Sequence, residues 1–366
     1  MDDSVDDGDG IYHIVFSTTT SADAAYSAIT PAQVTVTNTD NDSAGIAVSA
    51  ISGPTTETGG TAAFTVVLKA QPAADVTVHF HTDDPTEGVT DGTARTFAAA
   101  NWNMPQTVTV TGVDDSVDDG DVHYQVVFDS TTSADGHYAD LTPDPVSVTN
   151  TDNDHAGVTV TAASAHTSEA GGTATFTAVL NTEPTASVVL HFNTDDSTEG
   201  VPSATSLTFT PANWNMAQSV VVTGVDDAVA DGDVTYHVVF SASTSTDASY
   251  AGITPASVLL VNDDNDAAAI HVTAAPGLTT SESGSTATFS IVLESQPTAN
   301  VTVGFNTDDD TEGVPNVTSR TFSPGNWSAP QFVTVTGQRR RDRCHEPDVH
   351  AWGLERCADG YGHGAG

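Results

Sequence analysis

A repeat with a period of 112 residues is the feature that most constrains the fold of this chain. Trp102 lies in the string NWNMPQ and Trp214 in NWNMAQ, and a third copy, NWSAPQ, places Trp327 one residue beyond the period. The string TDND ends at Asp154, and its counterpart DDND ends at Asp266. A fixed period of this size indicates a tandem array of one small domain. Whatever chemistry the repeat carries therefore recurs once per domain.

Acidic residues dominate the charge of the repeats. The chain holds 49 Asp and Glu against 8 Lys and Arg, and five of those eight lie from Arg339 onward. Such a surface repels nucleic acid and anionic membranes, and it suits bound cations or a salty medium. No apolar run approaches the roughly 18 residues of a membrane span. We therefore expect no nucleic-acid partner and no membrane span, and no signal peptide is visible either.

The two ends of the chain cut across the repeat. Residues 1–16 align with residues 113–128, with Met1 in place of Val113, so we expect that an internal GTG valine codon was read as a start. The third copy continues to Gly337, where arginines follow in place of the expected VDD; GTC-GAC-GAC read one base out of frame would give them. We interpret residues 338–366 as a disordered frameshift product without function. The alternative is a metal site, although its residues match no familiar zinc spacing: Cys344, His345, His350, Cys357 and His363.

Each copy alternates apolar and Thr-rich positions over short segments between turn signals, which predicts half-buried strands and no helices. Seven such segments in about 110 residues predict an immunoglobulin-like β-sandwich. In the first full copy the strands are expected near 45–50 and at 61–69, 75–81, 94–98, 106–112, 122–129 and 145–150. The chain is then all-β, with tandem seven-stranded sandwiches head to tail. Full repeats span 43–154 and 155–266, residues 267–337 supply the first five strands of a third, and residues 1–42 supply the last two of another.

The acids are expected to converge at one end of each sandwich. Strand direction alternates in an antiparallel sandwich, so successive loops alternate between its two ends. Ten carboxylates at one end would repel one another unless cations lay among them. Oxygen ligands without His or Cys favour Ca²⁺ over zinc or copper; the alternative is the turn preference of Asp in a salt-adapted spacer. In the second full repeat the ten are Glu169, Asp195, Asp196, Glu199, Asp226, Asp227, Asp231, Asp233, Asp264 and Asp266.

The series SEAGGTATFTAVLN, VVLHFNTDD, SLTFTPANW, SVVVTGVDDAVADGD and VLLVNDDND resembles the Calx-β repeat. The resemblance covers nearly all of residues 1–337 and implies a seven-stranded sandwich that binds Ca²⁺ through these acids. Bacterial members commonly form long arrays in secreted or surface proteins. This chain departs from the family in reading DGDV where EGDE is usual and in an extra TEG. The ligands implied by position are Glu57, Asp83, Asp84, Asp114, Asp115, Asp152 and Asp154 in one repeat, and Glu169, Asp195, Asp196, Asp226, Asp227, Asp264 and Asp266 in the next.

These observations predict a Ca²⁺-stiffened stalk module of a bacterial extracellular or cell-surface adhesin, with its ions at the junctions between neighbouring repeats. The alternatives are a carbohydrate- or protein-binding module, for which Tyr138, Tyr250 and Trp102 supply few aromatics, and an acidic spacer without metal sites. An enzyme is not expected, because no nucleophile, histidine and acid recur together. The tryptophan of each NW string either packs against the preceding acid cluster or belongs to its own core. The incomplete end repeats predict head-to-tail self-association by strand addition.

Overall fold

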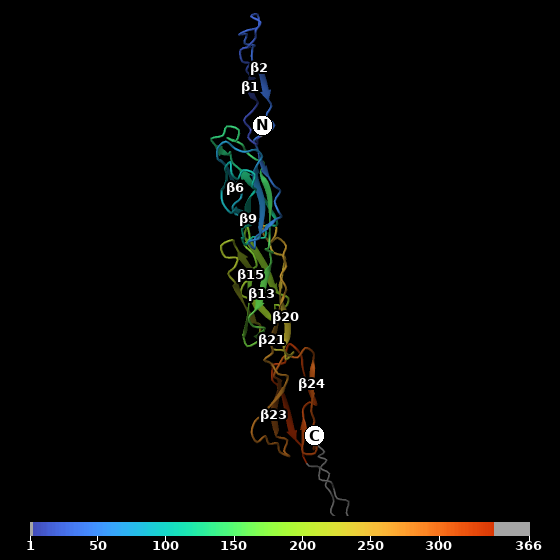
Figure 1. The fold of residues 1–366 in the computed structure, drawn as a ribbon. Coiled ribbons are helices and arrows are strands. Elements are labelled where there is room, and N and C mark those ends of the chain that lie inside the picture. The colour runs from blue at the N-terminus through green and yellow to red at the C-terminus, as the bar shows by residue number, and fades with distance from the viewer. Residues whose placement is uncertain (1–2, 340–366) are drawn as a thin grey trace, which may run out of the picture. The chain divides into compact units, whose positions relative to one another are not determined.

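The structure is a computed structural model that describes residues 3–339 (Figure 1). All regular elements are β-strands, β1 to β27, and within the described range no helix exists that could cross a membrane. The chain forms two compact units. The first contains the described residues up to His166 together with 173–223 and 236–260, and the second contains 167–172, 224–235 and the described residues from Val261 on. Apart from Gln338 and Arg339, the expected frameshift product at 338–366 lies outside the described residues.

The first full repeat is a sandwich of two sheets. One sheet has the order β3 (Ile46–Val48), β5 (Thr61–Leu68), β9 (Gln106–Gly112) and β7 (Gly88–Thr90). The other has the order β11 (Thr132–Ser133), β6 (Val76–Thr82), β10 (Val122–Phe128), β12 (Val146–Thr151) and β4 (Thr55–Thr56), with β8 (Ala94–Phe97) on the side of β6. The fold is therefore the all-β sandwich expected from the alternating pattern.

The core of this repeat follows from the period of two along each strand. In β5 every second residue is buried, and the residues between them, which are threonine, alanine and valine, face outward. Phe64 of β5 and Phe128 of β10 meet edge to face with ring centroids 6.1 Å apart, and Phe80 of β6 packs against Phe128 at 6.2 Å. Because the three rings come from both sheets, they join the two sheets into one core.

All seven expected strands of the first full repeat are present, each within two residues of its expected bounds. Three short strands were not expected: β4, β7 and β11. Each has two or three residues, which is too short for an alternating pattern to register. Their pairing comes from the rest of the fold, as in the parallel pair of β4 with β12 at Asn150 and Thr55.

The second full repeat has the same strands except for a counterpart of β11, where an isolated bridge joins Val189 and Thr244. One sheet has the order β13 (Val158–Ala162), β15 (Thr173–Leu180), β19 (Gln218–Gly224) and β17 (Gly200–Pro202). In the other layer β16 (Val188–Thr194) pairs with β18 (Ser206–Phe209) and with β20 (Val234–Phe240). The remaining strands are β14 (His166–Ser168) and β21 (Val258–Asp263).

The incomplete repeats contain the strands that their residues allow. At the N-terminal end, β1 (Gly10–Ile14) pairs only with β2 (Val34–Asn38) among the described strands. In the third copy, β22 (Ile270–Ala274), β23 (Thr286–Leu293), β27 (Gln331–Gly337) and β25 (Gly313–Pro315) form one sheet. Its other layer is the pair β24 (Val301–Gly304) and β26 (Ser319–Phe322). The buried core there is small: Ile291, Leu293, Phe322 and Val333.

Candidate metal centre

A buried glutamate anchors the acidic end of the first full repeat. Glu57 follows β4 in a tight turn in which Gly59 has a φ of 83°, a left-handed conformation that favours glycine. The Glu57 amide donates to the carbonyl of Thr151 at 3.1 Å, which holds the turn against the end of β12. The side chain is only 3% exposed, and its Oε2 accepts from the backbone amide of Asn153 at 3.0 Å. The fold thus carries a carboxylate into the interior at this end.

Residues 113–121, which join β9 to β10 and are here called the acidic loop, approach the same point. Asn153 donates its side-chain amide to Asp114 at 3.0 Å and to Glu57 at 3.3 Å. Asp152 closes the loop, because its carboxylate accepts from the amide of Gly120 at 2.7 Å and from the amide of Asp154 at 2.7 Å. These bonds fix the acids through the backbone and leave carboxylate oxygens directed at one another.

Two groups of three acids result in this repeat. Ligand oxygens of Glu57, Asp114 and Asp154 all lie within 4.8 Å of one another. The same spacing holds for a second group: Glu87, Asp115 and Asp119. Each group combines one buried glutamate with aspartates that are half-buried or exposed. The loops predicted to share one end of the sandwich do bring their acids together.

The pKa values of these acids reflect first their burial and then their crowding. Burial is the main cause that raises the pKa of Glu57 to about 7, and the charges of Asp152 and Asp115 add to it against the opposing hydrogen bond from Asn153. Burial is also the largest cause of the raised pKa values of Glu87 and Asp119, and the charges of neighbouring acids raise both further. At Glu87 the hydrogen bond from Asn150 opposes the rise. Ionised together at neutral pH, the groups destabilise one another unless positive charge is supplied.

The second full repeat has a related group, in which Glu169 and Asp266 are the counterparts of Glu57 and Asp154, while the third member is Asp264, the counterpart of Asp152, in place of Asp226. Ligand oxygens of Glu169, Asp264 and Asp266 lie within 4.8 Å of one another, and Glu169 is 5% exposed. Asn265 donates its backbone amide to Glu169 at 3.1 Å and its side-chain amide to Asp226 at 3.0 Å, as Asn153 does in the first repeat. The pKa of Glu169 is raised, chiefly by burial. A buried glutamate with two clustered aspartates is therefore common to both complete repeats.

The remaining predicted ligands are engaged in local hydrogen bonds. Asp83 accepts from the amide of Gln125 at 2.7 Å, and Asp195 accepts from the amide of His237 at 2.6 Å and from its ring at 3.0 Å. Asp84 and Asp196 each accept from the amide and the hydroxyl of the threonine two residues on. These bonds lower the pKa values of Asp84, Asp195 and Asp196. Asp227 accepts from the amide of Val229 at 2.6 Å.

The ligand set implied by the family resemblance omits Glu87 and Asp119, although their counterparts Glu199 and Asp231 are among the ten acids expected to converge. Glu87 lies in the TEG string that departs from the family pattern, and it recurs at the period as Glu199. Glu87 and Glu199 are buried, with exposures of 6% and 8%, whereas Asp119 is exposed. The signal available in the sequence was a glutamate that recurs with the period and is followed by glycine, which could have indicated a carboxylate that points inward.

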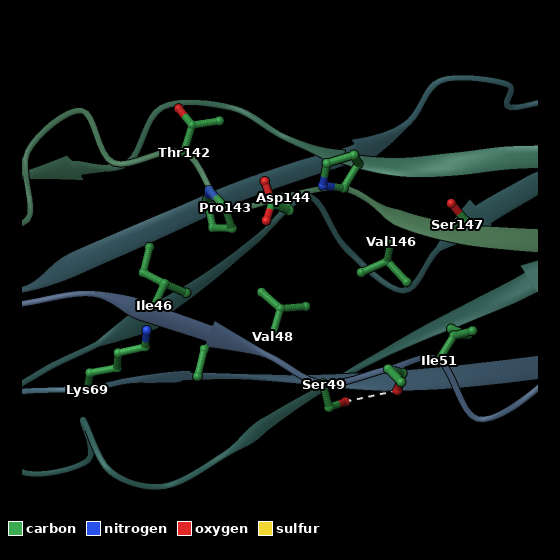
Figure 2. Close-up of a pocket in the computed structure, with 13 residues that line it drawn as sticks. Ile46, Val48, Ser49, Ile51, Lys69, Thr142, Pro143, Asp144, Val146 and Ser147 are labelled. Atoms are coloured by element: carbon green, nitrogen blue, oxygen red, sulfur yellow. Dashed lines mark hydrogen bonds between the residues drawn. The ribbon is translucent and has the colours of Figure 1, made fainter.

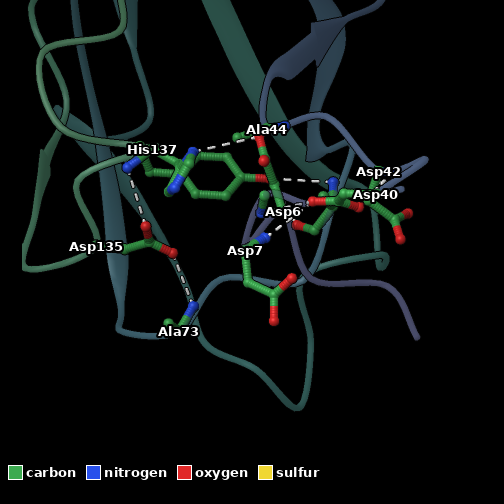
Figure 3. Close-up of polar contacts among 11 residues, drawn as sticks. Asp6, Asp7, Asp40, Asp42, Ala44, Ala73, Asp135 and His137 are labelled. Carbon is green, nitrogen blue, oxygen red and sulfur yellow. Dashed lines mark hydrogen bonds and ion pairs between the residues drawn. The ribbon is translucent and has the colours of Figure 1, made fainter. Parts of the chain in front are cut away.

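The acidic loop also contacts the repeat that follows. The carbonyl of Ser116 accepts from the amide of Glu183 at 2.6 Å, and the carboxylate of Asp118 accepts from the amide of Ala156 at 2.7 Å. One period earlier, Asp6 accepts from the amide of Ala44 at 2.8 Å, and His137 lies 3.4 Å from the same carboxylate (Figure 3). One loop therefore supplies both acids and junction contacts.

The aromatic side chains weighed earlier belong to the cores. Trp102, Trp214 and Trp327 each pack against the apolar core of their own repeat. Tyr138 and Tyr250 are each only 1% exposed. Buried in this way, the two tyrosines do not offer the exposed aromatic face that a carbohydrate- or protein-binding module would need.

A groove of about 750 Å³ opens in the first full repeat where β3 and the segment leading into β12 diverge (Figure 2). Ile46, Val48 and Val146 line it with Pro143, and Asp144 lies among them. The acid groups described above lie elsewhere, since none of their residues lines the groove.

The Calx-beta domain family matches residues 39–154, 151–265 and 263–316, which together cover more than half of the chain. The chain belongs to this family, as three tandem copies of its domain. No curated protein matches the sequence. Among solved structures, it is similar to CBD12 from CALX1.2, with 16% identity over 52% of this chain and 77% of that chain and a TM-score of 0.25. The calcium binding domain CBD12 of CALX1.1 is 15% identical over 52% of this chain and 77% of that chain, with a TM-score of 0.26. A marsupial T cell receptor is 11% identical over 81% of this chain and 94% of that chain, with a TM-score of 0.25.

Proposed function

We propose that each complete repeat binds Ca²⁺ at its acidic end and that the ions stabilise the array. The observation that carries the proposal is the buried glutamate of each complete repeat, Glu57 or Glu169, held within 4.8 Å of two aspartate carboxylates. Ca²⁺ takes six to eight oxygen ligands, and carboxylates are the oxygens that it binds most often. Membership of the Calx-beta family supports the same ion.

The donor set fits a hard cation. Every ligand candidate in the groups is a carboxylate, and the three basic residues before Arg339 are Lys69, Arg95 and Arg320, none of which lies in the acidic loops. Bound Ca²⁺ would supply the positive charge that the crowded acids lack. Glu57, Asp114 and Asp154 would hold one ion, and Glu87, Asp115 and Asp119 a second. Asp152, bonded to the amide of Gly120, would orient these groups. In the next repeat Glu169, Asp264 and Asp266 would hold an ion, and Asp226 and Asp227 would complete the set.

We assign Asp83, Asp84, Asp195 and Asp196 a supporting part in these sites. Their carboxylates are already used by backbone amides and threonine hydroxyls, so they would reach an ion only after those bonds rearrange. Asp83 and Asp195 tie the loop after β6 or β16 to the neighbouring strand, which fixes the approach of Glu87 and Glu199.

The proposed role of the array is structural. The acidic loop that carries Asp115 and Asp119 also bonds to Ala156 and Glu183 of the following repeat. An ion that fixes the loop would therefore fix the junction. We propose that the chain is a stalk-like part of a bacterial extracellular or cell-surface adhesin, whose neighbouring repeats are its principal partners. Surface labelling of the source cells with an antibody to these repeats tests the location.

Thermal unfolding of the full chain tests the calcium proposal. A ligand that binds only the folded state adds about 2.7 kcal/mol at 100 times its Kd, and for a domain of this size that raises Tm by about 10 °C or more. We expect this rise in millimolar CaCl₂ relative to EDTA, with a much smaller one in MgCl₂ or NaCl at matched ionic strength. An equal rise with every salt would contradict the calcium sites and favour the acidic spacer.

We also propose that the incomplete end repeats associate between molecules, head to tail. β1 and the residues after it have exposed apolar side chains on both faces, among them Ile11, Tyr12 and Val15, with exposures of 66%, 51% and 75%. At the other end β24 pairs with β26 alone among the described strands, whereas its counterpart β6 also pairs with β10. A strand added to β24 would complete that layer. A single sedimenting species of monomer mass at every concentration would contradict the association.

A further inference from the structure

A tyrosine closes the sandwich in both complete repeats. Tyr138 donates its hydroxyl to the carbonyl of Ala70 at 2.6 Å and accepts from the amide of the same residue at 3.0 Å. Tyr250 makes the same pair of bonds to Thr182, at 2.7 Å and 2.9 Å. In the second repeat the ring lies in a cluster with Leu180 and Val188. Each tyrosine therefore fills an apolar site whose floor is a backbone amide and carbonyl.

An aspartate three residues earlier makes a second contact with the same neighbourhood. Asp135 accepts from the amide of Ala73 at 2.8 Å and from the amide of His137 at 3.0 Å (Figure 3). Asp247 likewise accepts from the amide of Thr185 at 2.7 Å. The tyrosine and the aspartate thus attach one turn to the loop that follows β5 or β15.

The N-terminal piece carries the same turn with its tyrosine exposed. Tyr26 lies one period before Tyr138, and its side chain is 65% exposed. Asp23 accepts from the amide of Ala25 at 2.9 Å, Tyr26 donates its amide to the carbonyl of Asp23 at 3.0 Å, and Thr19 donates its hydroxyl to the carbonyl of Tyr26. Ala28 has a φ of 62°, matching 61° at its counterpart Asp140. The turn is therefore already in the conformation that it has when docked.

The third repeat contains a cavity at the corresponding site. It measures about 490 Å³ and is lined by Ile270, Leu293 and Val301, with the polar residues Ser295 and Thr298 at its edge. Leu293 and Val301 stand where Leu180 and Val188 contact Tyr250, and Ser295 and Thr298 stand where Thr182 and Thr185 bond the tyrosine and the aspartate. No charged residue lines the cavity. Its chemistry matches that of the two tyrosine sites.

We propose that this cavity binds Tyr26 of a second copy of the chain. The ring lies against Leu293 and Val301, the hydroxyl bonds to the backbone of Ser295, and Asp23 accepts from the amide of Thr298. This inference rests on the proposed head-to-tail association and names the contact that determines its specificity. Burying a preorganised tyrosine in a matched apolar site, with both hydroxyl bonds satisfied, gives the kind of contact that dominates protein interfaces.

Sedimentation of the full chain over a concentration series tests the contact. Tyr26→Ala is expected to raise the Kd of self-association at least about tenfold, and Tyr26→Phe, which keeps the ring and loses the hydroxyl bonds, is expected to give a smaller rise. Phe332→Ala is the matched control, because Phe332 is 62% exposed and lies on β27 outside the cavity. It should leave the Kd unchanged. Since Tyr26 is exposed, its replacement leaves the fold intact.

The outcomes separate the contact from the association. If the native chain associates and Tyr26→Ala associates equally well, the tyrosine site is wrong and the head-to-tail association stands. If the native chain stays monomeric, both are wrong. Photocrosslinking from benzoylphenylalanine at position 26, in a mixture of unlabelled and ¹⁵N-labelled chains, supplies a second measurement. Mixed-isotope products at residues 293–301 support the contact, and products found only within one chain or elsewhere overturn it.

Discussion

At the scale of single residues, Glu57 and Glu169 couple stability to pH. Their pKa values are raised in the folded protein, that of Glu57 from 4.5 to about 7. A carboxyl whose folded pKa lies above its unfolded value contributes stability below the unfolded pKa, and this contribution is lost as the pH rises through the folded pKa. We therefore expect Tm in EDTA to fall as the pH rises from about 4.5 to about 7.5. Because Ca²⁺ competes with protons for the same oxygens, saturating Ca²⁺ should remove or reverse this fall.

Glu57→Gln should change stability in opposite directions with and without the ion. In EDTA at pH 7.5 the variant loses a buried negative charge, so we expect its Tm to rise by a few degrees, on the order of 1 kcal/mol. In CaCl₂ it loses a ligand, so we expect the Ca²⁺-induced rise in Tm to shrink. Glu282→Gln is the matched control, since Glu282 is exposed at the corresponding place of the third repeat. A Glu57→Gln protein with an undiminished Ca²⁺ response would contradict the assigned site.

The sequence, through the family resemblance, implied Glu57, Asp114 and Asp154 as ligands, and these three lie together. It could not rank acids within a string. Asp83 and Asp84 stand beside each other after β6, yet their carboxylates bond to nearby amides while Glu87, three residues on, is buried. Which acid turns inward depends on the path of the loop, and the period alone does not determine that path.

At the scale of elements, the close approach of β4, β9 and β12 requires glycine at the end of β9. A Cβ at Gly112 would overlap the carbonyl oxygen of Thr56 and the side chain of Asn150. Asn150 is 1% exposed and bonded on several sides, so it cannot move away without loss. We expect Gly112→Ala to destabilise the first full repeat by about 2 kcal/mol or more.

Gly53→Ala is the control for that substitution, because no atom lies within 4 Å of a Cβ at Gly53 and its φ is not left-handed. We expect it to leave the denaturation midpoint nearly unchanged. Equal midpoints for the two variants in chemical denaturation would show that the packing of β9 against β4 and β12 is looser than described.

The long strands were predictable because burial on one face imposes a period of two, and β5 and β10 carry that period over seven or eight residues. The short strands were not. β4 has two residues, and it is a strand only because β12 runs parallel beside it. Pairing between distant segments of this kind leaves no periodic mark in either segment.

At the scale of the whole molecule, Asp118 ties one repeat to the next. Its carboxylate accepts from the amide of Ala156 at 2.7 Å, and its carbonyl accepts from the hydroxyl of Ser249 at 3.0 Å. In Asp118→Ala we expect amide hydrogen exchange at Ala156 to accelerate about tenfold, which corresponds to the loss of one charge-assisted hydrogen bond. Ala44, bonded to Asp6 in the same way, is the internal control and should keep its rate. Unchanged exchange at Ala156 would contradict a role for Asp118 at the junction.

The period predicted the array and placed its acids at junctions, but it could not predict the bonds that join the repeats. The bond that recurs at every junction uses the backbone of Ser116 and Glu183, and the side chains at these places vary among the copies: Ser4, Ser116 and Ala228 on one side and Gln71, Glu183 and Gln296 on the other. Because the amide and the carbonyl are common to all residues, the same contact persists while the sequence changes.

The acidic loop belongs to two repeats at once, and this has a mechanical consequence. When a pulling force unravels one repeat, the loop before it loses the amides of Glu183 and Ala156 that hold it, and the preceding acid group loosens. Resistance to force in such a chain is therefore a property of neighbours rather than of single domains. An internal repeat, supported from both sides, should rupture at a higher force than the same sequence placed last in the array.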